Sequence, residues 1–176
     1  MKLNLASGTN IRDGWINLDV VPRWPTAPRG CDVIWDARKD VIPFPDGSAD
    51  EVYAGYLLLH LAPQHHDFVL QEIRRVLSSS GTLMVGEVDM RAVMSLYLED
   101  PFNSRCSELI WGEQGNWING DTSEYAEFDK HCQGFTQETL EYLLDKNGFH
   151  DFMRIKIHAD EVYYELTLVC RRKSDV

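Results

Sequence analysis

Short, largely apolar runs bounded by turn residues recur along the chain. Runs of this length are typical of strands, and the first alternates between apolar and polar residues as a half-buried strand does. The runs cover residues 2–6, 15–19, 32–35, 51–54, 82–88, 152–157 and 163–170. The sequence therefore predicts seven strands.

Apolar residues at helical spacing separate some of these runs. Residues 64–77 carry a stripe that recurs every three or four positions, formed by Phe68, Val69, Ile73, Val76 and Leu77. We expect Leu70, Ile73 and Leu77 to be buried against the sheet, and residues 78–81 to end this helix. Residues 92–98 have a second helical pattern.

A third helix is predicted near the end of the chain. Thr136 is a good N-cap, the helix runs to about Asn147, and Gly148 is placed to end it. Strands that alternate with helices predict a Rossmann-like α/β fold with a mostly parallel sheet. The two consecutive strands at the end predict an antiparallel pair.

The first connection between strands is unusually short. Only eight residues, 7–14, join the first two predicted strands, whereas a parallel crossover usually needs a dozen or more and a helix. Eight extended residues span at most about 28 Å and a five-residue strand is about 17 Å long, so a shortened crossover without a helix is possible. NAD and FAD need a helix N-terminus after the first strand to bind their pyrophosphate. Because this chain has a poor one there, the sequence argues against NAD or FAD as the cofactor.

Composition indicates one ordinary globular domain over residues 1–176, with 44% hydrophobic and 26% charged residues. The chain has 17 basic and 28 acidic side chains, a net charge of −11, which repels phosphate backbones and disfavours a nucleic-acid partner. Its four cysteines form no CxxC pair, and it has no signal-peptide pattern and no run of 18 apolar residues. We therefore expect a cytoplasmic protein without a membrane partner.

Four stretches of the chain carry a family resemblance. They read LNLASGTNIRDGWINLD, DVIWDARKDVIPFPDGSADEVYAGYLLLHL, EIRRVLSSSGTLMV and GFTQETLEYLLDKNGF. In this order and spacing they resemble the class I S-adenosylmethionine-dependent methyltransferases. The likeness is to a short bacterial branch, methyltransferase type 11-like, often associated with surface-polysaccharide genes. It covers nearly the whole chain and implies S-adenosyl-L-methionine as the cofactor.

The resemblance also implies which residues bind this cofactor at the carboxyl ends of the strands. Ala6, Ser7 and Gly8 form the loop after the first strand, where Gly8 permits positive φ and close approach. Ala6 stands where the family has its first loop glycine. Asp19 ends the second strand, where its carboxylate can accept both ribose hydroxyls.

The next two strand ends complete the predicted cofactor site. Asp36 can accept an adenine amino proton, and the backbone of Ala37 can read a neighbouring ring nitrogen. Gly55 and Tyr56 end the fourth strand, where the family places the methyl donor beside the acceptor. Leu59 replaces a glutamate that often precedes the family's histidine, which is His60 here.

Residues 99–135 are expected to fold over the strand ends as a substrate cap, or else to form a dimer contact or packing arm. The stretch is long, broken by glycines and rich in both aromatic and acidic residues. His131 at its end matches a histidine of the resembling branch, and its imidazole suits removal of a hydroxyl proton. His60 is a candidate contact or a core-edge histidine. His65 and His66 point about 100° apart on a helix, so we expect an exposed helix start and no metal site.

These observations lead to one function and two alternatives. We expect methyl transfer to an oxygen or nitrogen of a small acceptor, such as a sugar derivative, by in-line displacement with no metal. The protein is expected to be a monomer or a homodimer. The alternatives are a non-catalytic binding module with the same fold, and an aminopropyl or aminocarboxypropyl transferase that uses the same cofactor.

Overall fold

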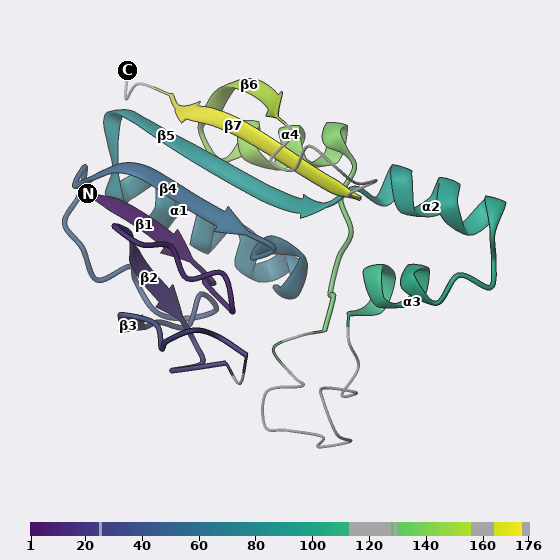
Figure 1. The fold of residues 1–176 in the computed structure, drawn as a ribbon. Coiled ribbons are helices and arrows are strands. Elements are labelled where there is room, and N and C mark those ends of the chain that lie inside the picture. The colour runs from purple at the N-terminus through teal and green to yellow at the C-terminus, as the bar shows by residue number, and fades with distance from the viewer. Residues whose placement is uncertain (25, 113–127, 129, 156–163, 174–176) are drawn as a thin grey trace.

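The computed structural model describes residues 1–24, 26–112, 128, 130–155 and 164–173. Its seven described strands form one sheet in the order β3-β2-β1-β4-β5-β7-β6 (Figure 1). The strands are β1 (Lys2–Leu5), β2 (Ile16–Asp19), β3 (Val33–Ile34), β4 (Ala49–Gly55), β5 (Leu77–Val88), β6 (Phe149–Ile155) and β7 (Glu165–Arg172). The first five strands pair in parallel, whereas β7 is antiparallel to both β5 and β6.

Helices cover one face of this sheet. The described helices are α1 (His66–Val76), α2 (Met90–Glu99), α3 (Ser104–Trp111) and α4 (Gln137–Lys146), with the 3-10 turns η1 (Leu58–His60) and η2 (Pro63–His65). In Figure 1, α1 and α4 lie behind the sheet, whereas α2 and α3 extend beyond the end of β5. No described helix is long and apolar enough to cross a membrane.

The face under α1 and α4 is apolar because strand register lines up small and branched side chains. One row across the sheet contains Leu18, Leu5, Ala54, Val85 and Leu168, each no more than 1% exposed. Leu70 and Ile73 of α1 join the same core, together with Leu77 at the start of β5, and all three are fully buried. Their predicted burial is confirmed.

Over β1 and β2 the opposite face of the sheet is polar, and this explains the short first crossover. Its neighbouring positions are Asn17, Asn4 and Tyr53, one step along each strand from the apolar row. Asn4 Nδ2 donates to Asn10 O at 2.8 Å, and Asn17 Oδ1 accepts from the backbone N–H of Arg12 at 2.8 Å. The loop of residues 7–14 therefore lies on this face through amide hydrogen bonds, and no apolar surface there requires a helix.

The predicted fold class is confirmed, but several boundaries are wrong. β5 begins at Leu77, so residues 78–81 form part of this strand instead of a separate turn after α1. Gly81 fits there because a Cβ would lie 2.8 Å from the Leu77 side chain. Helix α3 was not predicted. His66 is 2% exposed, since its Nε2 lies 2.9 Å from Leu58 O, so the expectation of an exposed histidine is wrong.

We predict that Leu70→Ala lowers the free energy of unfolding by about 2–5 kcal/mol. Leu70 is fully buried between α1 and the sheet, so truncation removes apolar contacts and leaves a cavity. Urea denaturation at constant pH measures the change. Tyr142→Ala on α4, where the side chain is 72% exposed, is the matched control and should change stability by less than about 1 kcal/mol.

Candidate functional site

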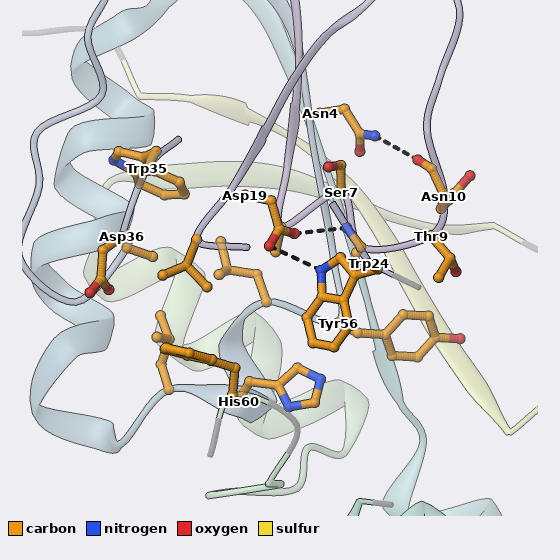
Figure 2. Close-up of a pocket in the computed structure, with 18 of the residues that line it drawn as sticks. Asn4, Ser7, Thr9, Asn10, Asp19, Trp24, Trp35, Asp36, Tyr56 and His60 are labelled. Carbon is orange, nitrogen blue, oxygen red and sulfur yellow. Dashed lines mark hydrogen bonds between the residues drawn. The ribbon is translucent and has the colours of Figure 1, made fainter. Parts of the chain in front are cut away.

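A cavity of about 340 Å³ opens at the carboxyl ends of β1, β2 and β4 (Figure 2). Its volume falls in the range typical of small-ligand sites. All eight residues predicted to bind the cofactor line it: Ala6, Ser7, Gly8, Asp19, Asp36, Ala37, Gly55 and Tyr56. The structure therefore brings together the residues that the sequence places at four separate strand ends.

The loop after β1 forms one wall of the cavity. Ala6 has φ +49° and Gly8 has φ +52°, both in the left-handed region. Ser7 N donates to Leu18 O at 3.0 Å, which holds the loop against β2. Ser7 Oγ lines the wall, is buried, and has no hydrogen-bond partner among the described residues. Burying a hydroxyl without a hydrogen-bond partner costs free energy of folding, so this atom indicates a place for a polar ligand.

Asp19 at the end of β2 is 4% exposed and oriented by three protein donors. Its Oδ2 accepts from Gly8 N at 2.8 Å. Its Oδ1 accepts from Val21 N at 2.8 Å. The same oxygen accepts from Trp24 Nε1 at 3.1 Å, a hydrogen bond drawn in Figure 2. The carboxylate therefore joins the first loop to the loop after β2 and also faces the cavity.

Asp36, just beyond β3, is held by the arginine two positions later. Arg38 donates to it through Nε and through Nη2, each at 2.8 Å. These hydrogen bonds lower the pKa of the Asp36 carboxyl to about 2, so it stays an anion. The Arg38 guanidinium also lies 4.8 Å from the centre of the Phe128 ring, and both residues line the cavity.

The end of β4 turns sharply into η1. Tyr56 has φ +55°, and its N–H donates to Gly86 O at 2.6 Å. Two of the three non-glycine residues with positive φ in the described chain, Ala6 and Tyr56, thus line the same cavity. Strained backbone that clusters at one cavity is a feature of functional sites.

A buried carboxyl group contacts the backbone of η1. Glu87 of β5 is fully buried and accepts from the backbone N–H groups of Leu58 and Leu59, at 2.9 and 3.2 Å. Burial raises the pKa of Glu87 to about 8. Leu59 stands where the resembling family often has an acid, and Glu87 lies against this same turn.

Two histidines meet at the end of η1. His60 lines the cavity, and His131 packs against it with ring centres 5.0 Å apart. His60 Nδ1 lies 3.2 Å from Lys130 O, and His131 Nδ1 lies 3.0 Å from Leu109 O. Since a carbonyl oxygen only accepts, both Nδ1 atoms carry the proton when the rings are neutral. Burial and then the neighbouring His131 lower the pKa of His60 to about 4.

The rest of the predicted site is described only in part. Residues 113–127 and 129 of the predicted cap lie outside the described residues, so the cap stays a prediction. His131 is not among the residues lining the cavity in the described part of the chain. No group of three or more metal-ligating side chains occurs among the described residues.

Sequence reasoning missed several residues that line the cavity, among them Trp24, Trp35, Arg38 and Tyr53. Tyr53 could have been found, because it lies two residues before Gly55 on the same face of β4. Trp24 carries no such signal, since its loop has no periodic pattern. Its position depends on contacts that only the folded chain makes.

We predict that Ala6→Gly stabilises the protein by about 0.5–1 kcal/mol. Glycine relieves the left-handed strain at φ +49° but makes the unfolded chain more flexible, which offsets part of the gain. Urea denaturation tests this change, and Ala62→Gly is the control. Ala62 has φ −63°, so its replacement should destabilise, and equal effects at both sites would contradict strain at Ala6.

Comparisons with known proteins agree with this geometry. Residues 27–85 match the family model of the methyltransferase domain. No curated protein matches the chain. A solved S-adenosylmethionine-dependent methyltransferase from Thermotoga maritima, described as a possible histamine N-methyltransferase, is 18% identical with a TM-score of 0.62, and the match covers 98% of this chain and 82% of that one.

Two further solved structures have the same fold. An S-adenosylmethionine-dependent methyltransferase from Methanosarcina mazei is 16% identical, with a TM-score of 0.63, over 99% of this chain and 92% of its own. Human N-acetylserotonin methyltransferase, in complex with S-adenosylmethionine, is 17% identical with a TM-score of 0.58, over 98% of this chain and 47% of its own. The chain has the class I methyltransferase fold, and the predicted resemblance is confirmed. The predicted enzyme class and cofactor agree with the family match.

Proposed function

We propose that this chain transfers the methyl group of S-adenosylmethionine to an oxygen or nitrogen atom of a small acceptor, such as a sugar derivative. The observation that carries the proposal is the cavity lined by all eight positions that the resemblance assigns to the cofactor. The match of residues 27–85 to the methyltransferase domain supports the same activity.

The polar groups of the cavity suit this cofactor. Asp19 and Asp36 are anionic acceptors for a ribose hydroxyl and for the adenine amino group, and Ala37 offers its backbone beside Asp36. Ser7 Oγ is a buried hydroxyl that a polar ligand atom can satisfy. Ala6, Gly8, Gly55 and Tyr56 complete the walls beside the loop and the end of β4.

When bound, S-adenosylmethionine supplies an electrophilic methyl group. What remains for the protein is to orient the acceptor, exclude water and take up a proton. His131 was the predicted proton acceptor, but His60 is the imidazole on the cavity wall, with His131 packed against it. We therefore assign proton removal to His60 Nε2 and the positioning of its ring to His131.

The acceptor class is the least specific part of the proposal. One structural neighbour is described as a possible histamine N-methyltransferase and another is named for N-acetylserotonin, so both are associated with small molecules. A net charge of −11 supports a neutral or cationic acceptor and argues against nucleic acid. We also propose that the chain forms a single domain and that it acts in the cytoplasm as a monomer or homodimer.

Calorimetry with S-adenosylmethionine and S-adenosylhomocysteine tests the first half of this proposal. We expect both ligands to bind, and Asp19→Asn to weaken both. Incubation with S-adenosyl-[methyl-³H]methionine then tests the second half, with histamine, N-acetylserotonin and a set of amino and neutral sugars as acceptors. We expect labelled product with at least one of them.

The outcomes separate the alternatives. No binding at millimolar ligand would contradict the proposal and favour a non-catalytic module. Label transferred from carboxyl-labelled but not from methyl-labelled cofactor would contradict methyl transfer and identify an aminocarboxypropyl transferase.

A further inference from the structure

The hydrogen bonds of Asp19 limit what this carboxylate can offer a ligand. A carboxylate has two oxygens with about four acceptor sites in total. Oδ1 accepts from both Val21 N and Trp24 Nε1, and Oδ2 accepts from Gly8 N. Three of the four sites are therefore taken by the protein, and only Oδ2 retains one.

The three donors are not equivalent. The N–H groups of Gly8 and Val21 belong to the backbone. The third donor is a side chain, the Trp24 indole, in the loop of residues 20–32 between β2 and β3. Trp24 is half-buried and lines the cavity, and in the view of Figure 2 its ring lies between Asp19 and His60.

Trp24 thus occupies an acceptor site that a ligand hydroxyl would otherwise use. A ribose presents two adjacent hydroxyls, and the resemblance led us to expect that Asp19 accepts from both. With the indole N–H on Oδ1 at 3.1 Å, a second hydroxyl finds no acceptor site on that oxygen.

We propose that Trp24 sets the recognition of the cofactor ribose, so that Asp19 accepts a hydrogen bond from only one of the two ribose hydroxyls. This inference rests on the proposed function, because it presumes an adenosyl cofactor in the cavity. The other hydroxyl is then free to face solvent or another wall, and its removal should cost little.

Calorimetry with S-adenosylhomocysteine and its 2′-deoxy and 3′-deoxy analogues tests this. For the natural protein we expect one analogue to bind about 10- to 100-fold more weakly, since a hydrogen bond to a charged acceptor is lost. The other analogue should bind within about threefold of the parent. In Trp24→Phe the indole donor is gone, so we expect tighter binding of the parent and a loss of affinity for both analogues.

Trp15→Phe is the matched control. Trp15 is also half-buried, but it is not among the described residues that line the cavity, and its ring packs against the side chains of Lys2 and Arg12. The pattern of the two analogues should therefore stay that of the natural protein. Thermal unfolding of each variant checks that it is folded, and the analogue comparison in the natural protein decides between one and two hydroxyl contacts even if Trp24→Phe does not fold.

Two results would overturn the inference. Equal, large losses for both analogues in the natural protein would mean that Asp19 binds both hydroxyls and that Trp24 moves away. Weaker binding of the parent to Trp24→Phe would mean that the indole contacts the ligand instead of competing with it. Failure of the parent ligand to bind at all would instead contradict the proposed function and this inference together.

Discussion

Replacing Asp19 by alanine is expected to weaken S-adenosylmethionine binding by about 100-fold or more. One ribose hydrogen bond to a charged acceptor is worth about 1.5–3 kcal/mol, which is about 10- to 100-fold in affinity. The same carboxylate also accepts a hydrogen bond from Gly8 N at 2.8 Å, so its removal frees the loop after β1, which forms one wall of the cavity. Calorimetry measures the combined loss.

Asp19→Asn separates the two contributions. An asparagine keeps the size and one acceptor oxygen, so the first loop should stay closer to its native position while the charge is lost. We expect the cofactor affinity of Asp19→Asn to lie between those of the natural protein and Asp19→Ala. For Asp19→Ala we also expect the free energy of unfolding to fall by about 1–3 kcal/mol, because buried N–H groups are left without an acceptor. Unchanged cofactor affinity in a folded Asp19→Ala protein would show that this carboxylate does not bind the ribose.

Replacing His60 by alanine should lower turnover by about 10²- to 10⁴-fold, the usual range for loss of a general base. The reason is geometric, since His60 lines the cavity and its Nδ1 is engaged by Lys130 O, which leaves Nε2 to take up a proton. Initial rates with the acceptor identified by the labelled-cofactor screen measure the effect. Cofactor affinity should fall far less than turnover.

The pH dependence gives an independent test of this role. His60 can accept a proton only when it is neutral, and its pKa is lowered to about 4. Activity should therefore persist as pH falls through the ordinary histidine range near 6.5 and be lost only as pH approaches about 4. His131→Ala should reduce turnover less than His60→Ala and raise the pH of that loss, because His131 helps to lower the pKa of His60. An activity loss centred near 6.5 in the natural protein would argue for a different base.

Much of the site followed from the sequence because of how parallel strands are arranged. The carboxyl ends of β1, β2 and β4 meet at one edge, so the residues after each strand gather there without any knowledge of side-chain packing. Ala6, Asp19 and Tyr56 are examples. The first crossover was also predictable, because eight residues cannot contain both a helix and the return path.

Contacts between loops were not predictable in this way. Three contacts depend on loop conformations. They are the pairing of Asp36 with Arg38, the hydrogen bond from the Trp24 indole to Asp19, and the packing of His131 against His60. No periodicity specifies these conformations, since they arise from hydrogen bonds between distant segments. The boundary at Leu77 was missed for a related reason, because residues 78–81 look like a turn, and β4 pairs with β5 on either side of them, at Leu77 and from Thr82 onward.

The polar face of the sheet has a consequence for exchanging parts between such domains. Suppose that residues 7–14 were replaced by a longer connection with an amphipathic helix, grafted from a domain with helices on both faces. Its apolar side would lie on Asn4 and Asn17 and would remove their hydrogen bonds with Asn10 O and Arg12 N, each worth about 0.5–1.5 kcal/mol. The short loop and the two asparagines therefore form one module, and a working chimaera must exchange them together.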